Sequence, residues 1–288
     1  MRPVISLSFG IVVLVAASTC LVPGSPTASA QGIGPTKDEV YFSLARRINA
    51  QSESPVSAIV NSLGEVIEIQ QIAILSEGKA TVVVKELAPS NARSTNRSIR
   101  LVFVPTDQKD KWLWESFEDN RKFYPVEKLF PYAKERLTQS RQLTDRAWAG
   151  LLDIMSKEGE AAVKVVTTAK AILKTDPAPL APLTLARSAL AEAVKGKEVE
   201  AILNSHRELV TAIEQVLALA DNYAELKAND AFLRLVDELK AVQGSRVSIR
   251  TAYVDAVAAY NDDIRRLPFA LVAYGMEFTK MDAKIQPE

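Results

Sequence analysis

Apolar side chains recur at alternating spacings of three and four through the C-terminal half of the chain, which is typical of long helices packed side by side. The first series is Leu152, Met155, Gly159, Ala162, Val166, Ala169 and Leu173, and the second is Val199, Ile202, His206, Leu209, Ile213, Val216, Ala220 and Tyr223. The third is Tyr253, Val257, Tyr260, Ile264 and Leu267, preceded by Phe232, Leu235, Leu239 and Val242 on the same helix or on one kinked near Gly244. Helices of about forty residues are rods of roughly 60 Å, which bury such stripes only against one another. The spacing therefore predicts an elongated, antiparallel, all-α bundle over residues 126–288.

The segment before the bundle changes from a helical period to a strand period. Thr36 and Glu39 form a predicted capping box for a helix over "KDEVYFSLARRIN", and a second short helix starts with Pro55 in its first position and ends at Gly64. Four strands are expected next, as two hairpins: "EVIEIQQIAIL", "ATVVVKEL", "IRLVFV" and "WLWESF". Residues 31–125 are therefore predicted to form an α+β module with a four-stranded antiparallel sheet.

Alternation in the first of these strands slips once. Ile67 and Ile69 point to one face, whereas Ile72 and Ile74 are in the opposite phase. A β-bulge between the two pairs is the simplest cause, and bulges bend sheets. Helices followed by a bent antiparallel sheet are analogous to cystatin-like and NTF2-like folds, an analogy that concerns the fold alone.

The first thirty residues have the organisation of an export signal. Arg2 precedes an apolar run over residues 4–22, and Ala28-Ser29-Ala30 has the small-x-small pattern of a signal-peptidase site. We expect a signal peptide over residues 1–30, cleavage after Ala30, and a periplasmic, extracytoplasmic or cell-envelope location. Two alternatives stay open: the run is kept as an anchor that contacts the membrane, or Cys20 accepts a lipid.

Charge and cysteine content exclude several classes of function. Thirty-five Lys and Arg offset thirty-five Asp and Glu, and the longest basic clusters are "ARR" and "IRR", so nucleic acid is not an expected partner. Cys20 is the one cysteine, and the predicted cleavage removes it. The mature chain is then expected to have no disulfide, no cysteine nucleophile and no cysteine-ligated zinc.

Catalytic constellations are not found in the sequence. His206 is the one histidine and lies on an apolar stripe, so we interpret it as a core or rim residue. Leu203 stands three residues before it, which excludes the Glu-x-x-His pair of helical di-metal sites. Acidic neighbours such as Glu158 with Glu160 are interpreted as solvated helix faces, and so are Asp237-Glu238 and Asp262-Asp263. No nucleophile elbow, Walker loop or dinucleotide motif occurs, so we expect neither an enzyme nor a cofactor.

The stretch "RTAYVDAVAAYNDDIRRLPF" is predicted to be the last core helix. Tyr253 and Tyr260 lie on its buried stripe, Arg265 stands in the final turn, where it complements the helix dipole, and Pro268 ends it. The stripe does not explain Asn261, which we expect to bond a neighbouring helix or the hydroxyl of the adjacent tyrosine.

With "ELKANDAFLRLVDEL" before it and "ALVAYGMEF" after it, this stretch resembles the C-terminal signature of the LemA family. The resemblance covers residues 222–278 clearly and extends less strongly back to about residue 137. The chain has Gln243 where that family usually has Glu, and Val254 where Asn is common. The matched positions are Leu226, Lys227, Ala228, Asn229, Phe232, Leu235, Arg250, Tyr253, Tyr260, Asn261, Ile264, Pro268, Gly275 and Phe278.

The resemblance implies an envelope-associated, mostly helical protein with no catalytic residues to carry over. The family usually places its bundle directly after an N-terminal membrane segment, whereas this chain inserts the α+β module. We expect an exported, non-enzymatic scaffold that contacts an envelope protein. The alternative is a small-ligand-binding protein in which Trp112 or Trp114 lines a pocket of the module, although such a pair is also typical of a core. The residues considered for partner contact are Lys227, Asn229, Phe232, Arg250, Tyr253, Tyr260, Asn261, Arg265 and Pro268.

Overall fold

The computed structural model describes residues 34–285, apart from residues 52, 76, 88–96, 109–110 and 175–179. The predicted signal peptide, its cleavage site and Cys20 lie outside the described residues. From Gly34 onward the chain forms one compact unit. In the described part of the chain, no helix combines the length and the apolar character needed to cross a membrane.

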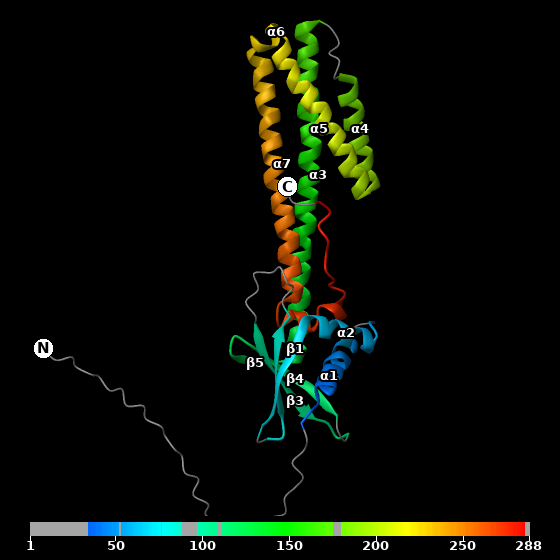
Figure 1. Ribbon diagram of the computed structural model, residues 1–288, viewed down its shortest axis with the longest axis vertical. Helices are drawn as coiled ribbons and strands as arrows, with labels where there is room; N and C mark the ends of the chain where they lie inside the picture. The colour runs from blue at the N-terminus through cyan, green and yellow to red at the C-terminus, as the bar shows by residue number, and fades with distance from the viewer. Residues whose placement is uncertain are drawn as a thin grey trace, which may run out of the picture. The chain divides into compact units, whose positions relative to one another are not determined.

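Two short helices begin the described fold (Figure 1). The first, α1 (Lys37–Asn49), opens with the predicted capping box, in which Glu39 N–H donates to Thr36 Oγ1 and Thr36 N–H donates to the Glu39 carboxylate. The second, α2 (Val56–Val66), has Pro55 as its cap rather than as its first helical residue. It also continues through Gly64, so the predicted end was two residues early.

A five-stranded antiparallel sheet follows α2, with its strands in sequence order. The four predicted strands are present, and the register of the first pair shifts between Ile69 and Gln71, which confirms the bulge. The expectation of an α+β module is therefore confirmed, with one strand more than predicted. The strands are β1 (Ile67–Ile74), β2 (Ala80–Glu86), β3 (Ser98–Pro105), β4 (Trp112–Asp119) and β5 (Lys122–Pro125).

The strand that sequence reasoning missed is β5. It pairs with β4 through a two-residue turn, with Asp119 opposite Lys122. Both turn residues have positive φ, 48° at Asn120 and 64° at Arg121, as the tight hairpin turns that match the sheet twist require. Glycine usually occupies the second position of such a turn. Because Arg121 stands there, the sequence lacks the usual turn signal.

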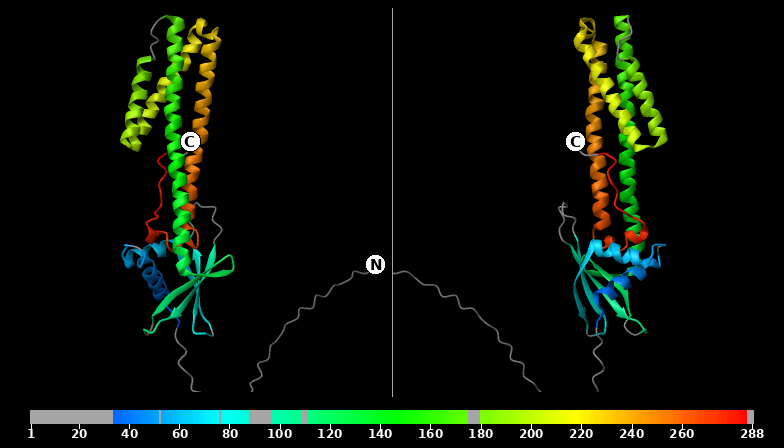
Figure 2. Two further views of the ribbon diagram at one scale, coloured as in Figure 1. Left: turned by 180° about the vertical axis from the view of Figure 1, so that it is seen from behind. Right: turned by 45° about the vertical axis from the view of Figure 1, so that its right-hand side comes forward.

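Long helices form the rest of the structure, as predicted. α3 and α7 run side by side in every view (Figures 1 and 2), and α3 is about 68 Å long at the usual rise per residue. The five residues of the third apolar series from Tyr253 to Leu267 are buried, and α7 is one helix through Gly244. The helices are α3 (Leu129–Leu173), α4 (Leu180–Gly196), α5 (Val199–Asn222), the single turn α6 (Ala224–Lys227) and α7 (Asp230–Arg265).

The proline-rich segment "KTDPAPLAPL" differs in part from the connector that we predict there. α4 begins at Leu180, so Pro182 lies in its first turn. A proline is tolerated at that place because the first N–H groups of a helix have no intrahelical partner. A second break, at Lys197 with φ 59°, separates α4 from α5 and was not indicated by the apolar spacing.

One apolar core joins the sheet to the ends of α3 and α7 that lie next to it. It contains sheet residues such as Trp114 together with Leu129 of α3 and Tyr260 of α7. The predicted boundary between residues 125 and 126 lies where β5 meets a short 3-10 helix, η1 (Val126–Lys128), and the core continues across it. A buried carboxylate reinforces the junction, because Glu86 Oε1 accepts a hydrogen bond of 2.7 Å from Leu267 N–H.

Candidate functional site

The C-terminal part of the chain turns back along the bundle. After α7 it forms two short 3-10 helices, η2 (Phe269–Leu271) and η3 (Tyr274–Met276), at the sheet end of the helices. Residues 277–285 then run back along the long helices with no regular secondary structure, and are drawn in red in Figures 1 and 2. We call residues 277–285 the C-terminal strap.

Asn261 holds the strap through its main chain. Its side-chain Nδ2 donates to the carbonyl of Met281 over 2.7 Å, and its Oδ1 accepts from the N–H of the same residue over 2.8 Å. One amide side chain thus satisfies both main-chain groups of a single strap residue, as a neighbouring strand does in a sheet. The expected bond from Asn261 to a helix or a tyrosine is therefore wrong, since its partner is the strap.

The two tyrosines of the same helix extend this contact in both directions. The Tyr260 hydroxyl donates to the Thr279 carbonyl over 3.0 Å, and the Tyr253 hydroxyl accepts from the Lys284 N–H over 3.1 Å. Burial raises the pKa of both tyrosines above the ordinary value, so both hydroxyls keep their protons at neutral pH. Three side chains of α7 therefore bond to main-chain atoms of three strap residues.

Strap side chains add anchors at the far end. The Lys284 ammonium lies 4.6 Å from the centre of the Trp148 ring, a cation–π distance, and Trp148 packs on Tyr253 with ring centres 5.3 Å apart. Ile285 is buried among residues of the bundle core. Thr144 Oγ1 lies 3.6 Å from Met281 Sδ. The strap thus combines main-chain recognition with one buried apolar side chain, Ile285, and with three partly buried ones, Phe278, Met281 and Ala283.

The other matched positions have structural roles or lie at the surface. Asn229 caps α7, where its side chain accepts from the Phe232 N–H over 3.0 Å, and Phe232 is fully buried. Pro268 is buried directly after α7, Lys227 is exposed, and Arg265 is half-buried. Of the nine residues considered for partner contact, the structure therefore places Tyr253, Tyr260 and Asn261 together on the strap, and Arg250 in a pocket beside its end.

An ionic group is buried in the bundle at the height of the strap's end. Glu158 of α3 is fully buried, and its Oε2 lies 3.0 Å from His206 Nε2 of α5 and 3.2 Å from Arg246 Nε of α7. The interpretation of Glu158 as part of a solvated face is therefore wrong. Gly159 beside it allows α5 to come close, because a Cβ there would meet the Leu209 side chain at 3.3 Å. His206 is buried at the rim, as predicted.

The two tryptophans of β4 have different surroundings. Trp114 is fully buried in the sheet core, and its indole N–H donates to the Ser116 carbonyl over 3.0 Å. Trp112 is half-buried and lines a hollow of about 410 Å³ together with Ser43, Arg46 and the β3–β4 loop. Of the two tryptophans considered for a small-ligand pocket in the α+β module, Trp112 is therefore the one that stays a candidate.

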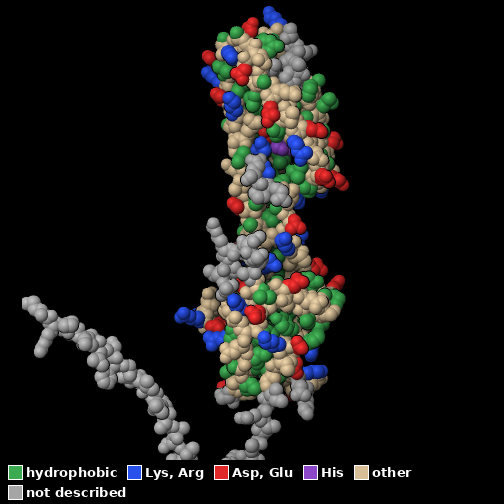
Figure 3. Space-filling model, viewed as in Figure 1, with side chains coloured by type: hydrophobic (Ala, Val, Ile, Leu, Met, Phe, Trp, Pro, Cys, Tyr) green, Lys and Arg blue, Asp and Glu red, His purple; other side chains and the backbone are tan. Residues whose placement is uncertain are grey.

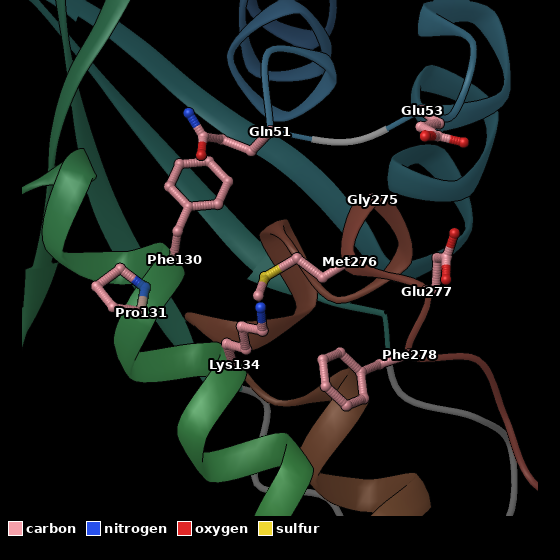
Figure 4. A pocket seen from close by; sticks show the side chains of 9 residues that line it. All are labelled: Gln51, Glu53, Phe130, Pro131, Lys134, Gly275, Met276, Glu277 and Phe278. Carbon is pink, nitrogen blue, oxygen red and sulfur yellow. The ribbon is translucent and has the colours of Figure 1, made fainter.

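A second hollow, of about 520 Å³, lies where the start of α3 meets the chain after η3. Figure 4 shows Phe130, Lys134, Met276 and Phe278 gathered around it, with Glu53 and Glu277 on one side. Its lining mixes apolar side chains with charges of both signs and does not converge on one ligand type. No cluster of three or more metal-ligating side chains occurs among the residues that the structure describes.

Sequence reasoning missed the strap itself and the buried Glu158. The strap segment "EFTKMDAKI" has no strand or helix periodicity, so no pattern predicts where it lies. For Glu158 a signal was present, because it sits directly before Gly159 of the first apolar series and His206 lies on the second series. Two titratable residues on facing stripes indicate a buried pair.

Comparison with known families gives a match over the helical region. The family model described as the LemA family matches residues 147–284, which run from α3 through the strap to Lys284. A search of curated proteins found no match. The match is wider than the span over which the signature residues are clear, and it includes the three α7 side chains that bond to main-chain atoms of the strap. The C-terminal helical region of this chain therefore matches the LemA family model from residue 147 to residue 284.

Proposed function

We propose that this protein is an exported, non-enzymatic scaffold of LemA type whose bundle binds an extended peptide segment of an envelope protein along α3 and α7. One observation carries the proposal: Asn261, Tyr260 and Tyr253 bond to main-chain atoms of the strap. Main-chain bonds recognise an extended conformation whatever its sequence, as in complexes where a peptide adds to a sheet edge. The surface that holds the strap therefore has the chemistry of a peptide-binding site.

The buried residues of the site support binding rather than chemistry. The two tyrosine hydroxyls and the Asn261 amide are already engaged by strap main-chain atoms, and the pKa values of both tyrosines are raised by burial, away from acid–base function near neutrality. A partner segment would displace the strap and take over its hydrogen bonds. Because the strap is attached to the same chain, it competes with a partner segment at a high effective concentration. A partner segment that displaces the strap therefore needs an apolar anchor that binds more strongly than Ile285 does.

Crosslinking and co-purification from intact cells test this function. We expect a partner crosslinked to the wild-type chain to be lost in Asn261→Ala and retained in Asp255→Ala, which removes an exposed side chain of the same helix. Both variants must show the wild-type melting curve. A partner that binds Asn261→Ala as well as the wild type would contradict a site at the strap.

The location is tested separately at the N-terminus of the mature chain. If the protein is exported through a cleaved signal, N-terminal sequencing will start at Gln31. Recovery from the cytoplasm with Met1 intact would contradict export. This result does not affect the peptide-binding surface, which lies in the described residues.

A second candidate function is small-ligand binding in the α+β module. It rests on the half-buried Trp112 beside a hollow of about 410 Å³. A ligand there would change the tryptophan fluorescence of the wild type and leave that of Trp112→Phe unchanged. Fluorescence that responds in both proteins would exclude Trp112 as the reporter and disfavour this candidate.

A further inference from the structure

A pocket of about 490 Å³ opens on the bundle beside the end of the strap. Its walls come from four separate segments, which are α3, α5, α7 and the strap. Five lining residues are basic and five are apolar. The basic ones are His206, Arg207, Arg246, Arg250 and Lys284, and the apolar ones are Leu151, Met155, Leu203, Val210 and Ile285.

The charge of this lining has one sign. Among the described residues that line the pocket, none is acidic, whereas four carry a permanent or near-permanent positive charge at pH 7. The chain as a whole has a net charge of zero, so the concentration of cations here is local. In Figure 3 the histidine colour is visible between basic side chains on this face of the bundle, where His206 is 7% exposed. Such a lining attracts an anion.

The buried Glu158 lies behind the lining rather than in it. It is fully buried and pairs with His206 and Arg246, so it fixes the directions of two lining side chains. Its second oxygen, Oε1, is buried and has no hydrogen-bond partner among the described residues. A buried ion pair is a costly way to stabilise a helical core, because apolar side chains of similar volume usually serve as well or better. The arrangement is better explained as orientation of cations toward a ligand.

We infer that this pocket binds a small amphiphilic anion, with an oxyanion head of the phosphate or carboxylate class and a short apolar body. Arg207, Arg246 and Lys284 face the head, and the apolar walls contact the body. Guanidinium groups suit this head because they bind oxyanions through two parallel hydrogen bonds. Lys284 and Ile285 belong to the strap, so the pocket is complete only while the strap is in place.

Hexyl phosphate is the probe that matches this chemistry, and His206 is the reporter. Because the chain contains one histidine, its imidazole gives a single set of ¹H–¹⁵N signals. We expect hexyl phosphate to shift these signals saturably, inorganic phosphate to do so at higher concentration, and hexanol and hexylammonium to leave them unchanged. Vesicles of phosphatidylglycerol, compared with phosphatidylcholine, show whether a lipid headgroup also enters the pocket or whether the ligand is a soluble anion.

Exposed cations of the pocket supply variants that do not disturb the buried pair. Arg207→Gln and Lys284→Gln each remove one charge from the lining, and we expect each to weaken hexyl phosphate binding about tenfold. Arg234→Gln and Lys280→Gln are matched controls, since they remove an exposed charge from α7 and from the strap outside the pocket. Both controls are expected to bind as the wild type does.

Three results would overturn the inference. The His206 signals stay unchanged with hexyl phosphate, or hexylammonium shifts them equally, or Arg207→Gln and Lys284→Gln bind as tightly as the controls. The test is separable from the proposed peptide site, because hexyl phosphate is added to the wild-type chain with its strap in place and no partner present. A chain whose partner is lost in Asn261→Ala, and whose wild type nevertheless ignores hexyl phosphate, retains the proposed function and lacks the anion site.

Discussion

Two consecutive parts of the C-terminal chain are held in different ways. Residues 267–273 bury apolar side chains in the core that joins the sheet to the long helices. The N–H groups of residues 270–273 bond within their own turns, whereas that of Leu267 bonds to Glu86. Residues 277–285 bury Ile285 and keep Phe278, Met281 and Ala283 partly buried, and main-chain groups of three strap residues bond to Asn261, Tyr260 and Tyr253. The first part depends on which side chains it carries, whereas the second depends mainly on its extended main chain. We therefore assign residues 267–273 to the fold and residues 277–285 to the candidate site.

The largest expected effect lies in the first part. Leu271 is 1% exposed within the joining core, so Leu271→Ala should lower the free energy of unfolding by about 2–5 kcal/mol through lost burial and a residual cavity. Denaturant titration measures this loss. Lys280→Ala, an exposed position in the strap, is the control and should change the free energy by less than about 0.5 kcal/mol. Equal losses in the two variants would remove the distinction between the two parts.

A pair of substitutions at one strap residue separates main chain from side chain. Met281→Pro removes the N–H that donates to Asn261 Oδ1, and it should weaken strap docking by about 1–3 kcal/mol because a partly buried acceptor loses its donor. Met281→Leu keeps the N–H and a similar volume, so it should cost less than about 1.5 kcal/mol. Exchange protection of the Lys284 amide measures docking in both. A larger loss in the leucine variant would show that the side chain dominates.

Alkaline pH should act on the strap in a defined direction. Burial raises the pKa of Tyr253 and Tyr260 in the folded chain, so the unfolded chain releases these protons first. Their contribution to stability is therefore complete below the ordinary tyrosine pKa near 10 and is lost as the pH rises through the higher folded values. Unfolding free energies from pH 8 to pH 11 should fall less steeply in the Tyr253→Phe/Tyr260→Phe variant than in the wild type. Parallel curves would contradict this assignment.

The smallest effect is expected at an exposed strap side chain. Asp282 contacts Lys280 at the surface, and both side chains are mostly exposed. Asp282→Ala should change strap docking by less than about 0.5 kcal/mol, since surface ion pairs contribute little and the main chain is retained. Exchange protection at Met281 checks this value. A loss as large as that of Met281→Pro would show that strap side chains, and not its main chain, set the affinity.

The elements that could be predicted from the sequence are those with a regular local pattern of side chains. Apolar spacing indicated the long helices, the capping box located α1, and the slip between Ile69 and Ile72 located the bulge in β1. β5 was missed because its turn uses Arg121 where glycine is usual. These successes and this miss have the same cause, which is that local patterns report local geometry.

Contacts between residues that belong to no helical or strand pattern could not be predicted in the same way. The bonds from Asn261 to Met281 join residues 20 apart, and Met281 lies in a segment with no regular secondary structure. Glu158 looks like other acidic helix residues until α5 and α7 are placed against it. The candidate sites therefore lie where the tertiary arrangement, and not the helical period, decides what each side chain touches.

The most direct test of the main-chain account is amide hydrogen exchange at Met281 and Lys284 in the wild type and in Asn261→Ala. We expect both amides to be protected in the wild type and the Met281 amide to lose most of its protection in the variant, while amides in the core of β2 and β3 keep theirs. Asp255→Ala should leave every one of these rates unchanged. A Met281 amide that exchanges as slowly in Asn261→Ala as in the wild type would contradict the claim that the signature asparagine holds the strap.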